Sequence, residues 1–441
     1  MKLLKQLQRI VLSFALMICA TIALAGDAPN PLIFVHGGAG SASQFESQAM
    51  RFTSNGYAQD QLFAFEYDSS FRVETLTTVL ARLDQFIADV RSKTGSEKVD
   101  IMGHSLGTYV LQTYLANPAR ALPIAHYINI DGYSSAVLPG NVPTLALWAE
   151  IGNGGSVAGA NNVVIPGQTH VEAATSAESF AQMYLFLTGE EAATTEILPS
   201  VSKHITLAGR TTLFPMNVGV NGSVVEIYEL DGTTGQRKKS FPAATFAIDA
   251  SGNWGPFNAH RDEYYEFVIV REGQNHHVYK EPFLRDDHFV RLMTSPVGGG
   301  VGANMDVDPG QSNLVISRDR EFWGEPTLGN DLLAINGQNV INAQNSPFSK
   351  RTTAIYLYDV DSDQQSDLTT PIPYFHSLPF ITGNDLYIPA SADASGRIRI
   401  TITGRGEGGA MQVLNIPNWP SDTDRISVLF NDFVQGDSWA K

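Results

Sequence analysis

A regular alternation of strand and helix signals between residues 31 and 190 constrains the fold of this chain most. Continuous apolar runs are typical of buried parallel strands, and they recur at 31–37, 61–68, 98–103, 125–131, 142–148 and 161–166. Apolar residues at helical spacing predict helices over 75–92 and 105–116, and a last helix whose capping box is formed by Thr175 and Glu178. We therefore expect a mostly parallel sheet with helices on both faces.

The pattern changes after residue 190. Short β-branched and aromatic runs now alternate with turn pairs such as Asp231-Gly232 and Asn336-Gly337, which predicts an all-β sandwich or barrel. The expected organisation is an α/β domain and two β subdomains, with these bounds: signal peptide 1–25, α/β domain 26–190, linker 191–204, and β subdomains 205–295 and 296–441.

The first residues have the pattern of an export signal. Three basic residues precede an apolar run at 10–22, and Ala23-Leu24-Ala25 matches a small-x-small cleavage site. The sequence thus predicts a secreted or periplasmic protein. Its single cysteine, Cys19, lies inside the predicted signal, so we expect a mature chain without disulfides.

The net charge of −16 excludes some classes of partner. Nucleic-acid binding needs basic patches that neutralise phosphates, so we expect no nucleic-acid partner. The apolar run at 10–22 is too short for a comfortable membrane span, and an acidic surface is not attracted to anionic lipids, so we expect no stable membrane insertion. Nothing in the sequence indicates an obligate protein partner.

A G-x-S-x-G pentapeptide at 103–107 lies between a predicted strand and a predicted helix. In this context the pattern indicates a nucleophile elbow, a sharp turn that exposes a serine above the edge of the sheet. Gly103 and Gly107 would allow the turn, and Ser105 would stand at a helix N-terminus, where developing negative charge is stabilised. A glycine-rich turn with a capping serine is the structural alternative.

A nucleophilic serine needs a base and an acid that orients the base. His170 is the candidate base, because it follows a predicted strand and its loop opens on the side of the sheet where Ser105 stands. Two candidate acids end strands at the same edge, Asp131 and Glu150, and both precede the histidine in the chain. Spacing leaves the choice between them open.

The oxyanion of an acyl-transfer reaction needs backbone N–H donors. The candidates are the N–H of Leu106, which follows the serine, and that of Gly38 in the loop after the first strand. The glycine loop at 36–40 lacks the G-x-G-x-x-G spacing of a nucleotide site. The acidic segment 359–367 lacks the glycine and the final glutamate of a calcium loop, so it is interpreted as a solvated loop. We expect no metal and no cofactor.

Several segments resemble α/β-hydrolase lipases and carboxylesterases, closest to archaeal long-chain lipases in which a small hydrolase domain precedes a large β-barrel domain. The resemblance rests on "PLIFVHGGAGSASQFESQAMRFTSNGY", "GHSLGTYVLQTYL", "INIDGYSS", "VPTLALW" and the "TH" before the last predicted helix. It implies an α/β-hydrolase fold, Ser105 as nucleophile, His170 as base, Asp131 as acid, and Gly38 and Leu106 as oxyanion donors. The segment between Gly38 and Ser105 leaves no obvious room for the helical lid of the archaeal enzymes.

The sequence therefore predicts an exported serine carboxylester hydrolase that acts on ester or lipid substrates through an acyl-enzyme. The β region would aid substrate binding. An amide or thioester hydrolase with the same three residues is the first alternative, since one triad serves several acyl transfers. A non-catalytic surface-binding protein on a hydrolase scaffold is the second.

Overall fold

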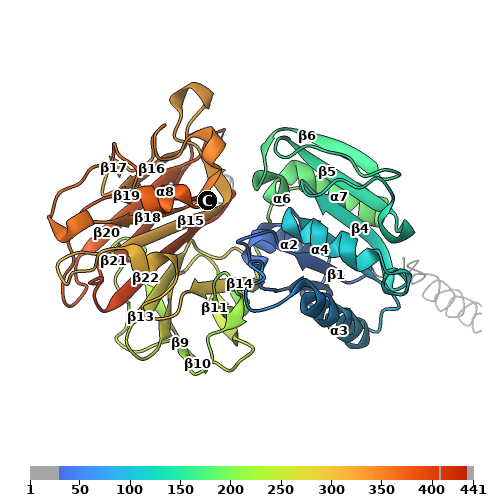
Figure 1. Ribbon diagram of the computed structural model, residues 1–441. Helices are drawn as coiled ribbons and strands as arrows, with labels where there is room; N and C mark the ends of the chain where they lie inside the picture. The colour runs from blue at the N-terminus through green and yellow to red at the C-terminus, as the bar shows by residue number, and fades with distance from the viewer. Residues whose placement is uncertain (1–28, 407–408, 435–441) are drawn as a thin grey trace, which may run out of the picture.

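The computed structural model describes residues 29–406 and 409–434. The predicted signal peptide at 1–25 and Cys19 lie outside the described residues. Two bodies stand side by side, an α/β part formed by the first 190 residues and a β-rich part formed by the rest (Figure 1). Within the described ranges, no helix is both long and apolar enough to cross a membrane.

The α/β part is built on a six-stranded parallel sheet with the order β2-β1-β3-β4-β5-β6. The strands are β1 (Leu32–Val35), β2 (Leu62–Phe65), β3 (Val99–His104), β4 (Ile124–Ile130), β5 (Thr144–Ile151) and β6 (Asn161–Thr169). Because β2 lies on one side of β1 and all later strands on the other, the strand order reverses between β1 and β3. Ligands of open α/β sheets bind at such a reversal, outside the carboxyl ends of the strands.

Helices cover both faces of this sheet. One face packs against α2 (Glu46–Ser54), α6 (Glu172–Thr175) and α7 (Ala177–Thr188), and the other against α3 (Leu76–Thr94), α4 (Leu106–Leu115) and α5 (Pro118–Ala121). Each interface is a separate apolar core, one centred on Phe34 and Phe180 and the other on Ile101 and Leu111. The predicted three-layer α/β-hydrolase fold is confirmed.

The β-rich part contains sixteen strands among the described residues. They are β7 (His204–Leu213), β8 (Val218–Gly219), β9 (Val224–Leu230), β10 (Ala244–Ala247), β11 (Asn253–His260), β12 (Tyr264–Val270), β13 (Asn275–Lys280), β14 (Asp287–Thr294), β15 (Leu314–Phe322), β16 (Leu332–Ile335), β17 (Gln338–Asn339), β18 (Thr352–Tyr358), β19 (Ile381–Asp385), β20 (Arg397–Thr403), β21 (Met411–Pro417) and β22 (Asp424–Phe430). One short helix, α8 (Pro373–Ser377), packs beside β19.

The largest sheet of this part among the described residues has eight strands, in the order β10-β9-β12-β13-β22-β15-β18-β19. The sheet of β7, β8, β11 and β14 packs on one end of it, and the sheet of β16, β17, β20 and β21 packs on the other. The expected all-β region is thus confirmed. The boundary between 205–295 and 296–441 stays a prediction, because β22 at the chain end inserts between β13 and β15 and joins both halves in one sheet.

One helix cap differs from the prediction. Ser176, not Thr175, caps α7, because its Oγ accepts the backbone N–H of Ser179. Thr175 instead ends the short helix α6, which the sequence pattern does not reveal. The Glu178 side chain accepts from Gln168 and does not complete a capping box.

A buried, charged interface joins the two parts. Lys280 of β13 binds Glu46 of α2 at 2.8 Å, and Arg291 of β14 binds Glu66 at 2.6 Å. The predicted linker also packs on the α/β part, since the carbonyl of Thr195 accepts the Arg51 Nε–H at 2.9 Å. The β part is therefore anchored to the elements that carry the candidate site.

Candidate active site

Ser105 stands at the turn between β3 and α4, at the strand-order reversal of the sheet. Its backbone has φ 51° and ψ −119°, a strained conformation for a residue with a side chain. Such strain is typical of a nucleophile elbow, which lifts the serine hydroxyl above the sheet. Among the described residues the Oγ has no hydrogen-bond partner, and Ser105 is only half-buried.

The elbow glycines allow this turn through close backbone contacts. A Cβ on Gly107 would overlap the carbonyl oxygen of Val35 and lie 2.6 Å from that of His36. A Cβ on Gly103 would lie 2.9 Å from the backbone of Gly107. Helix α4 can therefore start directly beside β1 only with glycine at both positions.

Asp131 and His170 meet beside this turn. Asp131 follows β4 and His170 follows β6, and the His170 Nδ1 lies 2.6 Å from the Asp131 Oδ2. Both side chains are almost completely buried. Burial by itself raises the pKa of Asp131, but the hydrogen bonds from His170 and from the Asn153 N–H lower it below its ordinary value. An ionised Asp131 keeps the proton of neutral His170 on Nδ1 and leaves Nε2 free as a base.

Glu150, the alternative acid, lies elsewhere. It is on β5, which extends past the predicted strand to Ile151, and its side chain is exposed. Its Oε2 accepts the N–H of Gly167 at 2.7 Å. The structure thus brings Asp131, not Glu150, into contact with His170.

His104 supports the same cluster from β3. Its Nε2 lies 2.9 Å from the carbonyl oxygen of His170, and the two imidazole rings are 4.6 Å apart. Burial, together with the His170 imidazole, lowers the pKa of His104 to about 3. A neutral His104 donates its Nε2–H to this carbonyl and fixes the backbone that carries the candidate base.

The candidate oxyanion donors lie on adjacent backbone. A Cβ on Gly38 would be 3.6 Å from the Leu106 side chain, and one on Gly37 would be 3.1 Å from the Ser105 Cβ. Asn217 of the β part holds this loop, because its Nδ2 donates to the carbonyl of Gly40 at 2.8 Å. The glycine loop after β1 and the elbow after β3 therefore share one edge of the sheet.

The β part also reaches the loops of Asp131 and His170. Glu321 of β15 accepts the N–H of Val171 at 2.7 Å and that of Glu172 at 3.2 Å. Arg351 donates to the Oδ1 of Asn153 at 3.1 Å, and the N–H of Asn153 donates to the Asp131 Oδ2 at 2.9 Å.

Family models match three segments of the chain. Residues 29–116 match class 2 lipases, residues 203–297 match the lipase C-terminal domain, and residues 300–434 match a further model described as a C-terminal domain. These matches support a lipase or esterase family with a C-terminal β domain.

Several solved structures resemble part of this chain. Lipase B of Aspergillus fumigatus aligns with 14% identity over 40% of this chain and 56% of its own, with a TM-score of 0.31. The lin2722 gene product of Listeria innocua aligns with 14% identity over 38% and 97%, with a TM-score of 0.28. Carboxylesterase CesB of Bacillus subtilis aligns with 13% identity over 37% and 85%, with a TM-score of 0.28. This chain thus spans 56% of the length of the Aspergillus lipase.

The side chains that position Asp131 and His170 were not predicted from the sequence. Asn153 follows β5 at the functional edge of the sheet, and a polar residue at a strand end is a signal that could have identified it. Glu321, Arg351 and Asn217 carry no comparable signal, because their partners lie more than a hundred positions away in the chain.

A cavity of about 470 Å³ lies between the two parts, beside the candidate site. It begins at Ala39 and Gly40, next to Gly38, and at Phe380, whose ring stacks on His170 with centroids 6.3 Å apart. The cavity then passes between the two parts, so both contribute to its walls.

In residues 29–406 and 409–434, no group of three or more His, Cys, Asp or Glu side chains is arranged to hold a metal ion. The predicted absence of a metal and of a cofactor stays a prediction. In the acidic segment, the carboxylates of Asp359 and Asp363 accept backbone N–H groups of the same loop.

Proposed function

We propose that this chain is a serine carboxylester hydrolase that cleaves acyl esters through an acyl-enzyme on Ser105. The contact of 2.6 Å between His170 and Asp131, beside the strained elbow of Ser105, carries the proposal. The family matches at 29–116 and 203–297 support it at the level of a lipase or esterase.

In the proposed reaction, His170 Nε2 takes the proton of Ser105 as the Oγ attacks the ester carbonyl. Asp131 stabilises the imidazolium that forms, and it stays ionised because its hydrogen bonds lower its pKa. The N–H groups of Gly38 and Leu106 stabilise the tetrahedral oxyanion. His170 then returns the proton to the leaving alcohol, and water releases the acyl group by the same route.

The test is hydrolysis of p-nitrophenyl esters of increasing acyl length, with fluorophosphonate labelling located by mass spectrometry. Ser105→Ala should lower kcat by about 10⁴-fold or more and abolish labelling. Ser200→Ala, a substitution outside the site, should leave both unchanged. Turnover that survives in Ser105→Ala would refute the mechanism.

The cavity supports a role of the β part in holding the acyl chain. It is lined by apolar side chains from the β part, among them Phe214, Met293, Val315 and Phe380. Val315→Trp should narrow it and lower kcat/KM for long-chain esters, while p-nitrophenyl acetate should be hydrolysed as before. An equal loss on both substrates would contradict this role.

Export is part of the proposal and rests on residues 1–25 alone. The test is N-terminal sequencing of the protein from a cell fraction outside the cytoplasm, with cleavage expected after Ala25. An intact N-terminus in the cytoplasmic fraction would refute it.

A further inference from the structure

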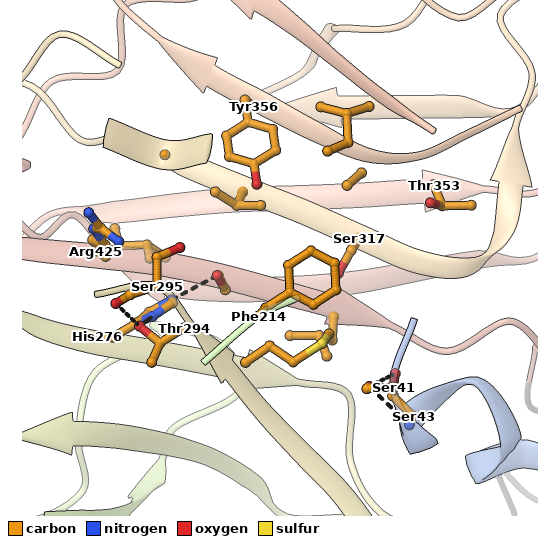
Figure 2. A pocket seen from close by; sticks show the side chains of 18 of the residues that line it. Ser41, Ser43, Phe214, His276, Thr294, Ser295, Ser317, Thr353, Tyr356 and Arg425 are labelled. Atoms are coloured by element: carbon orange, nitrogen blue, oxygen red, sulfur yellow. Dashed lines mark hydrogen bonds between the residues drawn. The ribbon is translucent and has the colours of Figure 1, made fainter. Parts of the chain in front are cut away.

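The cavity has two chemically different ends. Ser41 and Ser43 of the α/β part lie at one end, and Arg425, Ser295, His276 and Thr294 lie at the other, with Phe214 between them (Figure 2). The end near Ser41 adjoins the candidate oxyanion loop. The end near Arg425 is therefore the distal end, where the far terminus of a chain bound at Ser105 would lie.

The distal end contains hydrogen-bond donors with few acceptors among the described residues. Within residues 29–406 and 409–434, the Arg425 guanidinium makes one long hydrogen bond, from Nη2 to the carbonyl of Gly299 at 3.4 Å. The Tyr356 hydroxyl points into the cavity in Figure 2 and has no hydrogen-bond partner among the described residues. Burial raises the pKa of Tyr356 to about 12, although Arg425 opposes this shift, so the hydroxyl remains a donor at neutral pH.

No carboxylate of the described residues pairs with the positive charge at this end, although Asp422 and Asp424 also line the cavity. Arg271 does not line the cavity, but its Nη1 donates to the carbonyl of Ser295, a residue that does, at 2.6 Å. Among the residues that the structure describes, neither Arg271 nor Arg425 forms an ion pair. The adjacent Asp424 uses its carboxylate on His277 and Thr423.

His276, which also lines this end, leaves no ring nitrogen free to accept a hydrogen bond from Arg425 or Tyr356. His276 binds Thr294 Oγ1 through Nδ1 at 2.7 Å and Ser427 Oγ through Nε2 at 2.8 Å. Burial, with the nearby Arg271 and Arg425, holds the pKa of His276 well below its usual value, so the ring is neutral. The distal end thus combines a cation and a neutral hydroxyl donor, and among the described residues neither is paired with a carboxylate.

We propose that the distal end of the cavity binds a carboxylate at the end of an alkyl chain, with the Arg425 guanidinium and the Tyr356 hydroxyl as its donors. Half-buried guanidinium groups favour carboxylates because the hydrogen bonds are charge-assisted. A methyl terminus at this place would instead leave both donors unpaired and remove them from water. The middle of the cavity, at Phe214, is apolar and accommodates the chain between the two ends.

Two sources supply this chemistry. One is the ω-carboxylate of a substrate ester, such as a monoester of a long-chain dicarboxylic acid, and this form rests on the proposed ester hydrolysis. The other is a free fatty acid. Binding is therefore measured first in Ser105→Ala, where hydrolysis plays no part, and the failure of one proposal remains distinguishable from that of the other.

The binding experiment compares hexadecanedioate monomethyl ester with its neutral dimethyl ester and with hexadecanoate, by displacement of a fluorescent probe from Ser105→Ala. The monomethyl ester should bind at least about tenfold more tightly than the dimethyl ester. Adding Arg425→Gln should abolish this ratio, adding Arg425→Lys should keep part of it, and adding Tyr356→Phe should reduce it severalfold. Because the ratio compares two ligands on one variant, partial unfolding cancels.

Arg397→Gln is the matched control, because Arg397 is exposed on β20 and does not line the cavity. In the protein with Ser105 intact, ω-carboxy p-nitrophenyl esters should be preferred over methyl-terminated esters of equal length, and Arg425→Gln should remove the preference. A loss of affinity for hexadecanoate alone would support carboxylate binding and identify the free fatty acid as its source. Ratios and affinities that stay unchanged in Arg425→Gln and Tyr356→Phe would overturn the proposal.

Discussion

The Oε1 of Glu321, a fully buried side chain of the β part, accepts a hydrogen bond of 2.7 Å from the N–H of Val171, the residue after His170. Its Oε2 accepts from the Glu172 N–H and from the Thr169 hydroxyl. The loop that carries the candidate base is thus held by a carboxylate from another part of the fold. This relationship makes the β part a component of the site as well as a wall of the cavity.

Replacing Glu321 should therefore impair catalysis more than substrate binding. Glu321→Gln presents an NH₂ group to backbone donors, which costs about 1–3 kcal/mol and displaces His170. We expect kcat for a short p-nitrophenyl ester to fall by about 10- to 100-fold with KM nearly unchanged. Glu272→Gln, at an exposed turn, should match the parent.

A larger loss of kcat in Glu321→Ala than in Glu321→Gln would support a role of Glu321 in positioning His170, because the amide keeps one acceptor oxygen. A fall in melting temperature without a change in kcat would instead assign Glu321 a purely structural role.

The two acidic candidates should separate clearly by kinetics. Asp131→Asn should lower kcat by about 10⁴-fold, because an amide favours the wrong tautomer of His170. Glu150→Gln should be within about twofold of the parent, because Glu150 is exposed and, among the described residues, its side chain hydrogen-bonds with Gly167 alone. Ester hydrolysis at saturating substrate measures both, and a large effect of Glu150→Gln alone would reverse the assignment.

Asp319, at the interface between the two parts, should make the free energy of unfolding decrease as the pH rises. Burial, with the nearby carboxylates of Asp432 and Glu46, raises the pKa of Asp319 from 3.8 to about 7, although Lys280 opposes the shift. Between these values the folded chain binds more protons than the unfolded chain, so the free energy of unfolding contributed by Asp319 is lost as pH rises through this window.

Asp319→Asn should therefore raise the free energy of unfolding at pH 8 by about 1 kcal/mol. This change corresponds to a rise of about a few degrees or less in melting temperature. The gain should be absent at pH 4, where the aspartate is protonated in the folded state. Thermal unfolding across this range measures it, and an equal effect of the substitution at both pH values would contradict the raised pKa.

The elbow should not tolerate a larger residue at Gly107. Gly107→Ala should lower the free energy of unfolding by at least about 2 kcal/mol, because its Cβ meets the backbone of β1. Gly302→Ala is the control, since its nearest neighbour would be the Met305 methyl group at 3.5 Å. Chemical denaturation compares the two, and equal stability would show that α4 can move away from β1.

Local sequence patterns determined the strands of the α/β part and three of its helices. Apolar strand runs, helical periodicity and the glycines at 103 and 107 act over a few residues, so they predict the sheet, the helices α3, α4 and α7, and the elbow at Ser105. The helix cap was misplaced by one residue because Thr175 and Ser176 are chemically equivalent as caps, and only the backbone selects between them.

Tertiary structure decided which distant side chains meet. The sequence places Asp131 and Glu150 alike at strand ends on the same edge, and only the packed fold turns the Asp131 carboxylate to His170 while the Glu150 side chain is exposed on β5. The contacts of Glu321 with the His170 loop, and the donors of Arg425 and Tyr356 in the cavity, join segments that are far apart in the chain. Such contacts depend on how whole sheets pack, and no local periodicity or spacing encodes them.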